Sequence, residues 1–194
     1  MNHRDGSFQG AHGQSIYYRY WTPGSASRGV MLVVHGAGEH GDRYAYFAQR
    51  CCDAGLAVAA LDHAGHGKSD GDYGHMERFQ DHLDNLDAFR QQVVEAFPGQ
   101  PLVLVGHSMG GMLILRTLQE TGGLPPGRVV LMGSPVRSSA VARRLCGSAP
   151  GRWLLGESAE GGLLEALPDW SYGREIGVIA GELPVGFGML LGGL

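Results

Sequence analysis

The residues best suited to chemistry form the run Gly106-His107-Ser108-Met109-Gly110-Gly111. A serine with a glycine two places before it and another two places after it is typical of a nucleophile on a tight turn between a strand and a helix. The glycines let backbone pass close to the turn, and the amides that open the helix favour negative charge beside the serine. The run therefore predicts that Ser108 is a catalytic nucleophile. We expect the His107 side chain to leave the turn in another direction and to pack or hydrogen-bond locally.

A second glycine-rich run, His35-Gly36-Ala37-Gly38-Glu39-His40, follows the apolar stretch Val30–Val34. Such a loop can present a backbone N–H to the oxyanion that forms when a nucleophile attacks a carbonyl. The second donor would be the N–H of Met109, the residue after the nucleophile. A simple tight turn from strand to helix is the alternative interpretation of this loop.

A third run follows the apolar stretch Ala57–Leu61 and reads Asp62-His63-Ala64-Gly65-His66-Gly67-Lys68-Ser69-Asp70-Gly71. In this order, the three runs resemble the α/β-hydrolase superfamily. With Tyr18-Arg19-Tyr20-Trp21 and Arg43-Tyr44, they make residues 17–111 similar to monoacylglycerol lipases and lysophospholipases. The resemblance implies an oxyanion hole formed by Ala37 and Met109, a structural role for His66, and hydrolysis of a monoacyl ester through an acyl-serine intermediate.

The second half of the chain is more similar to compact α/β-hydrolase lipases and esterases. The residues that carry this likeness are Leu131–Pro135 and Glu175–Gly181. In such proteins the acid and the histidine of the triad follow the last of these segments, so the resemblance implies a C-terminally incomplete fold with an incomplete triad.

The elements that must position these runs alternate along the chain, which favours an α/β fold with a mostly parallel sheet between two helical layers. We expect a single domain over residues 1–194, with a short cap-like insertion at about 135–170. Helices are expected at Arg43–Ala54, Met76–Phe97 and Met109–Thr121. Strands are expected at Ile16–Trp21, Val30–Val34, Ala57–Leu61, Leu102–Val105, Val129–Met132 and Glu175–Ala180.

The sequence does not supply an obvious general base for Ser108. Triads of this superfamily run in the order Ser, acid, His, yet all nine histidines precede Ser108. His63, His66 and His75 lie on loops at or after the carboxyl end of the sheet and are the upstream alternatives. Glu182 is the candidate acid and Asp169 its alternative, although a surface role is the favoured interpretation of both carboxylates. A second functional hypothesis is therefore a catalytically crippled scaffold that binds a ligand or self-associates through the exposed C-terminal edge of its sheet.

Composition and motifs limit the partners, cofactors and cellular location that we expect for this protein. A formal net charge of -4 without a cluster of lysines and arginines argues against a nucleic-acid partner. Neither a metal-ligand spacing nor a nucleotide-binding glycine motif is present, so we expect no cofactor and no metal. The N-terminus does not resemble a signal peptide, the glycine-rich tail suits no membrane span, and the three cysteines show no regular spacing. We expect a cytoplasmic protein that acts on a small ester or a monoacyl lipid.

Overall fold

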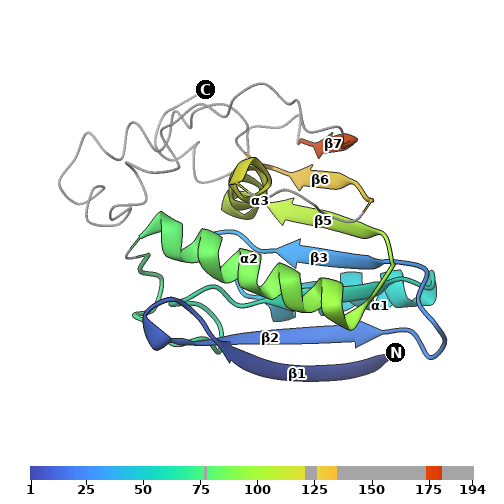
Figure 1. The fold of residues 1–194 in the computed structure, drawn as a ribbon, viewed down its shortest axis with the longest axis horizontal. Helices are drawn as coiled ribbons and strands as arrows, with labels where there is room; N and C mark the ends of the chain where they lie inside the picture. Colours follow the sequence, from blue (N-terminus) through green and yellow to red (C-terminus); the bar gives the residue numbers. More distant parts are fainter. Residues whose placement is uncertain (77, 121–125, 135–173, 181–194) are drawn as a thin grey trace.

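The protein's structure is a computed structural model that describes residues 1–76, 78–120, 126–134 and 174–180. Within these ranges the strands form one sheet in the order β1-β2-β4-β3-β5-β6-β7 (Figure 1). Strands β3 to β7 run parallel, whereas β2 pairs antiparallel with both β1 and β4. The strands are β1 (Asn2–Gln9), β2 (Ser15–Thr22), β3 (Val30–Val34), β4 (Ala57–Leu61), β5 (Leu102–His107), β6 (Val129–Met132) and β7 (Ile176–Ile179).

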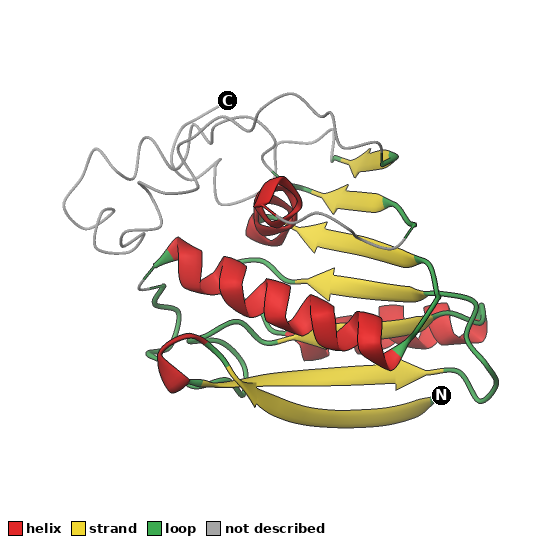
Figure 2. Ribbon diagram, in the orientation of Figure 1, coloured by secondary structure: helices red, strands yellow, loops and turns green. Residues whose placement is uncertain are grey.

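Helices cover both faces of the sheet (Figure 2). Helix α1 (Ala45–Asp53), which follows the short 3-10 turn η2 (Gly41–Tyr44), lies on one face, and α2 (Phe79–Ala96) and α3 (Met109–Glu120) lie on the other. Another short 3-10 turn, η1 (Ala11–Gly13), connects β1 with β2. The predicted α/β architecture of three layers is confirmed.

Strand β3 shows why the central strands are apolar throughout. Leu32 and Val34 pack in the core beneath α2 and α3, whereas Val33 packs in the core beneath α1. Successive side chains point to opposite faces of a strand, and here both faces are covered, so every position must be apolar.

The predicted bounds agree with the structure where apolar runs mark buried strands. Residues 30–34, 57–61 and 129–132 form strands with the predicted limits. The helix predicted at 43–54 begins instead as the 3-10 turn η2, and the one predicted at 76–97 is shorter at both ends. Strand β1 was not predicted, because its first residues are polar and exposed.

The strand β7 ends the sheet among the described residues, and the side chains of Val178 and Ile179 on it are more than half exposed. An edge of this kind can pair with another chain. Self-association through it stays a prediction, as does the single-domain assignment. The cap-like insertion expected at about 135–170 lies outside the described residues.

Candidate functional site

Ser108 occupies a left-handed turn between β5 and α3. Its φ is 51°, and among the described residues other than glycine it shares a positive φ with His12. The backbone holds this strained conformation with two hydrogen bonds, from Ser108 N–H to the Met132 carbonyl at 2.9 Å and from Gly111 N–H to the Ser108 carbonyl at 3.1 Å. Strain that the surrounding structure maintains in this way is common at functional sites.

The glycines around Ser108 allow neighbouring backbone to pass. A Cβ atom on Gly110 would overlap the carbonyl oxygen of Val34, and one on Gly106 would overlap the backbone of Gly111. A Cβ atom on Gly36 would lie 3.0 Å from the Cβ atom of Ser108. The two glycine-rich runs recognised in the sequence are therefore in direct contact.

The loop that follows β3 is fixed on either side of Ala37. The Gly36 N–H donates to Glu39 Oε2 at 3.1 Å, and the Gly38 N–H donates to His66 Nε2 at 3.1 Å. The N–H groups of Ala37 and Met109 donate no hydrogen bond within the described residues. In the part of the chain that the structure describes, the loop after β3 and the start of α3 thus each contain an amide without a hydrogen-bond partner.

Glu39 is a residue of this site that the sequence analysis did not single out. Its Oε2 atom accepts hydrogen bonds from the Tyr44 hydroxyl and from His107 Nδ1, both at 2.9 Å. Burial opposes ionisation, but the hydrogen bonds from Gly36, His107 and Tyr44 prevail and lower the pKa of Glu39. His107 thus bonds to Glu39 on the loop after β3 and not to a neighbour in sequence. Glu39 lies inside the second run, but its contact with His107 spans 68 residues, which local spacing does not reveal.

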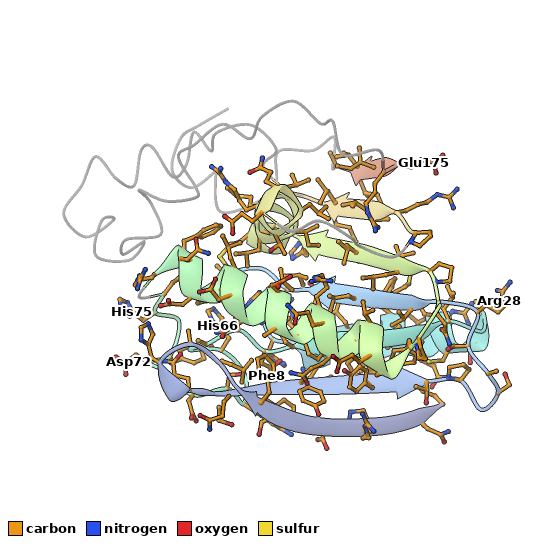
Figure 3. The ribbon with its side chains drawn as sticks, in the orientation of Figure 1. Phe8, Arg28, His66, Asp72, His75 and Glu175 are labelled. Atoms are coloured by element: carbon orange, nitrogen blue, oxygen red, sulfur yellow. The ribbon has the colours of Figure 1, made fainter. Side chains whose placement is uncertain are left out.

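Two of the upstream histidines have both ring nitrogens engaged. His35 Nδ1 bonds to the Gly36 carbonyl at 2.8 Å, and its Nε2 accepts the His63 N–H at 3.0 Å. His66 Nδ1 bonds to the Ala64 carbonyl at 3.0 Å, while its Nε2 accepts the Gly38 N–H. Figure 3 shows His66 at the end of the molecule toward which the parallel strands point, together with Asp72 and His75. His66 is thus fixed as an orienting group for the loop that holds Ala37.

His63 lies deeper, between His35 and His82, with ring centroids 4.3 Å and 5.2 Å away. Neither of its ring nitrogens has a hydrogen-bond partner. Burial lowers the pKa of His63 well below its ordinary value and lowers those of His35 and His82 to about 4, so these rings are neutral at pH 7. Within the described ranges, no hydrogen bond joins any histidine to Ser108 Oγ.

The carboxylate of Asp62 anchors the loop after β4. Its oxygens accept two hydrogen bonds from the Arg19 guanidinium, at 2.7 Å and 3.0 Å, and one each from the N–H groups of Gly41 and Lys68. Burial opposes ionisation, but these hydrogen bonds lower the pKa of Asp62. Asp62 therefore has a structural role.

Three further sequence predictions concern a metal site, a membrane span and the acid of the catalytic triad. No group of three potential metal ligands comes together among the residues the structure describes. In the same ranges, no helix combines the length and the apolar character needed to cross a bilayer. Glu182 and Asp169 lie outside the described residues.

Comparison with known proteins gives consistent matches. The family model Hydrolase_4, described as serine aminopeptidase, S33, matches residues 25–163. A monoacylglycerol lipase of Mycolicibacterium smegmatis is 34% identical over 97% of this chain and 70% of its own length. The human monoglyceride lipase is 37% identical over 62% of this chain and 40% of its own length.

Solved structures match over a similar range. A thermostable carboxyl esterase from Bacillus coagulans superposes with a TM-score of 0.66 at 30% identity, over 76% of this chain and 49% of the esterase. The chain thus spans about half the length of several proteins that it resembles, and 70% of the mycobacterial lipase.

Proposed function

This chain belongs to the Hydrolase_4 family, described as serine aminopeptidase, S33, and we propose that it hydrolyses carboxylic esters with Ser108 as the nucleophile. The family match and the solved relatives confirm the expected α/β-hydrolase fold and the likeness to monoacylglycerol lipases. The family description refers to amide cleavage, whereas the relatives above are lipases and an esterase. An ester of a monoacyl lipid is therefore the substrate class that we propose.

The observation that carries this proposal is the strained Ser108 turn beside two amides that have no hydrogen-bond partner among the described residues. Ser108 Oγ would bond to the ester carbonyl carbon, and the carbonyl oxygen would become an oxyanion. The N–H groups of Ala37 and Met109 would donate to that oxyanion, a type of contact whose loss typically slows acyl transfer by about 10²–10³. The alcohol would leave with a proton, and water would then release the acid and restore Ser108.

Serine needs a base to be a good nucleophile at neutral pH. His35 and His66 have both ring nitrogens engaged, and no described histidine bonds to Ser108 Oγ. This observation favours a second candidate function, a scaffold that keeps the turn but does not catalyse. A reactive Ser108 would need a base from outside the described residues or from a second copy of the chain.

Labelling with a fluorophosphonate probe, read by intact mass, separates the two candidates. An ester hydrolase should be labelled once per chain, and Ser108→Ala should abolish the labelling. Ser25→Ala is the matched control, because Ser25 is exposed and distant in sequence from all three runs, and it should be labelled like the parent protein.

A folded protein that resists the probe would contradict the hydrolase proposal and support the scaffold. If labelling occurs, a monoacylglycerol and an aminoacyl anilide should be compared as substrates. Faster turnover of the anilide would overturn the proposed ester preference.

A further inference from the structure

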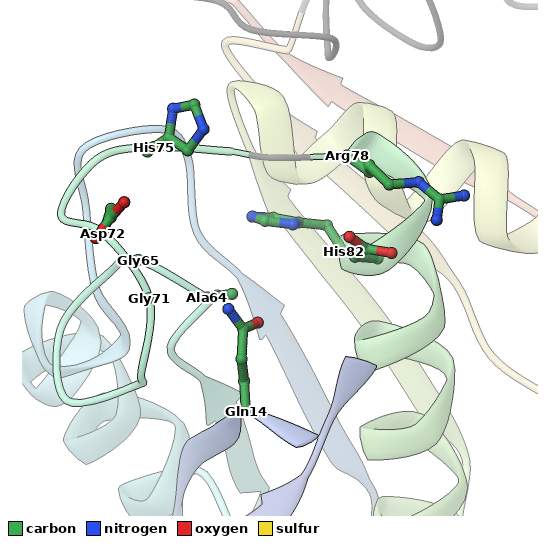
Figure 4. Close-up of a pocket in the computed structure, with 9 residues that line it drawn as sticks. Gln14, Ala64, Gly65, Gly71, Asp72, His75, Arg78 and His82 are labelled. Atoms are coloured by element: carbon green, nitrogen blue, oxygen red, sulfur yellow. The ribbon is translucent and has the colours of Figure 1, made fainter. Parts of the chain in front are cut away.

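A cavity of about 180 Å³ lies beside the N-terminal turn of α2, apart from the Ser108 turn and the Gly36–Glu39 loop. Figure 4 shows it between the loop after β4, the start of α2 and Gln14, which immediately precedes β2. None of the residues that line it has a part in the hydrolysis proposed above. Its role therefore needs a separate explanation.

Backbone hydrogen bonds close the loop that forms one wall of this cavity. Within the loop, Gly65 N–H donates to the Asp70 carbonyl and Gly74 N–H to the Gly65 carbonyl, both at 2.8 Å. Gly65 has a φ of +73°, and a Cβ atom there would lie 2.5 Å from the Asp72 carbonyl oxygen. The part of the loop from Gly65 to Gly74 is therefore closed on itself by contacts that only glycine permits.

His82 points into the cavity, with its ring stacked on His63. The residue is 2% exposed, and neither ring nitrogen has a hydrogen-bond partner among the described residues. Buried polar atoms in native proteins are nearly always hydrogen-bonded, and His82, unlike the equally unpartnered His63, lines a cavity that has room for such a partner. A neutral imidazole presents one donor and one acceptor, which a hydroxyl group satisfies from either side.

Charged groups of both signs line the cavity, so it is not built for an ion of one sign, and Asp81 is already paired with His12 Nε2 at 3.2 Å. Asp72 and Asp81 carry the negative charges, and Arg78 carries the positive one. Gln14, whose side-chain amide makes no hydrogen bond within the described residues, adds a further donor and acceptor. The volume exceeds that of a single water molecule severalfold and suits a molecule the size of glycerol.

We propose that this cavity binds a small neutral polyol whose hydroxyl groups pair with the His82 imidazole and the Gln14 amide. This proposal does not require a reactive Ser108, so it can fail or succeed independently of the proposed hydrolysis.

Nuclear magnetic resonance of the full chain with isotope-labelled histidine and glutamine tests this proposal, using glycerol as the probe. The His82 ring resonances should shift with glycerol and saturate in the roughly millimolar range. Sucrose at equal mass concentration is the control for general cosolvent effects, because a disaccharide is too large for the cavity. Intermolecular contacts should be detected between glycerol protons and the His82 ring.

Two variants locate the site. His82→Phe keeps a planar ring without either nitrogen, and it should abolish the saturable response of the Gln14 side-chain amide. Gln14→Leu keeps His82 and should weaken glycerol binding by about tenfold, as expected when one hydrogen bond is lost. Gln91→Leu, on the exposed side of α2, is the matched control and should bind like the parent protein.

Gln14 is only partly buried, so Gln14→Leu keeps the test valid if His82→Phe does not fold. A linear drift that sucrose reproduces, or contacts of the His82 ring with water alone, would overturn the proposal.

Discussion

Around Ser108, single glycines decide whether the turn can form. Gly110 is the clearest case, because an added Cβ atom would overlap the carbonyl oxygen of Val34 and would lie 2.7 Å from that of His35. Both obstacles are backbone atoms of a central strand and its loop, which cannot rotate away as a side chain can.

We therefore expect Gly110→Ala to lower the free energy of unfolding by about 3 kcal/mol, at the upper end of the range for overpacking. Urea denaturation measures this change. Gly24→Ala is the matched control, since a Cβ atom at Gly24 meets nothing within 4 Å, and it should alter stability by less than about 0.5 kcal/mol. Equal effects of the two substitutions would show that the turn tolerates a methyl group.

The buried histidine of α2 illustrates what the sequence offers at this scale. His82 lies three residues after Phe79, and both are buried. Residues three apart share a helix face, so the apolar pattern of this helix could have identified His82 as buried. The lack of a hydrogen-bond partner for its ring nitrogens among the described residues could not have been predicted, because it depends on how the loop after β4 lies against the helix.

Between elements, Asp62 joins parts that are distant in sequence. It connects β2 through Arg19, the start of η2 through Gly41, and its own loop through Lys68. The Arg19 and Asp62 side chains are 3% and 0% exposed, so water does not replace a lost partner.

Asp62→Asn should therefore lower the free energy of unfolding by about 3–5 kcal/mol, because the Arg19 charge would remain buried without its partner. Thermal and urea denaturation both report this change. Asp53→Asn gives a matched control on α1, where the pair with Arg50 is exposed and 3.9 Å long, and it should change stability by at most about 1 kcal/mol. A small effect of Asp62→Asn would mean that the hydrogen bonds of the Asp62 carboxylate are not needed for stability.

The elements that the sequence predicts best are those whose limits depend on burial alone. The apolar runs 30–34, 57–61 and 129–132 each become a strand with those limits, since no other element suits a short run covered on both faces. Strand β1 depends instead on antiparallel pairing with β2, as in the pair His3 and Trp21, and its polar residues carry no such signal. The same distinction holds for the candidate site. The glycine runs are contiguous in sequence and could be predicted, whereas the contact of Glu39 with His107 depends on the fold and could not.

For the whole molecule, the array of His35, His63 and His82 links stability to pH. Burial lowers the pKa of each ring below the ordinary value of 6.5, to about 4 for His35 and His82. Above pH 6.5 these rings are neutral in both the folded and the unfolded chain, so the stabilising effect of their neutrality is complete. As the pH falls from 6.5 toward 4, the unfolded chain takes up protons that the folded chain does not, and stability declines.

The free energy of unfolding should therefore fall between about pH 6.5 and pH 4, by up to about 1.4 kcal/mol per pH unit for each ring. This window lies above the one in which Asp62 is protonated, because the pKa of Asp62 is lowered from 3.8. Urea denaturation at a series of pH values gives the slope of the unfolding free energy against pH. His82→Phe should reduce this slope by the contribution of one imidazole ring. His3→Gln, on the exposed strand β1, should leave the slope unchanged. A flat profile down to pH 4 would mean that water or a counter-charge reaches the array, and that these rings protonate without unfolding the protein.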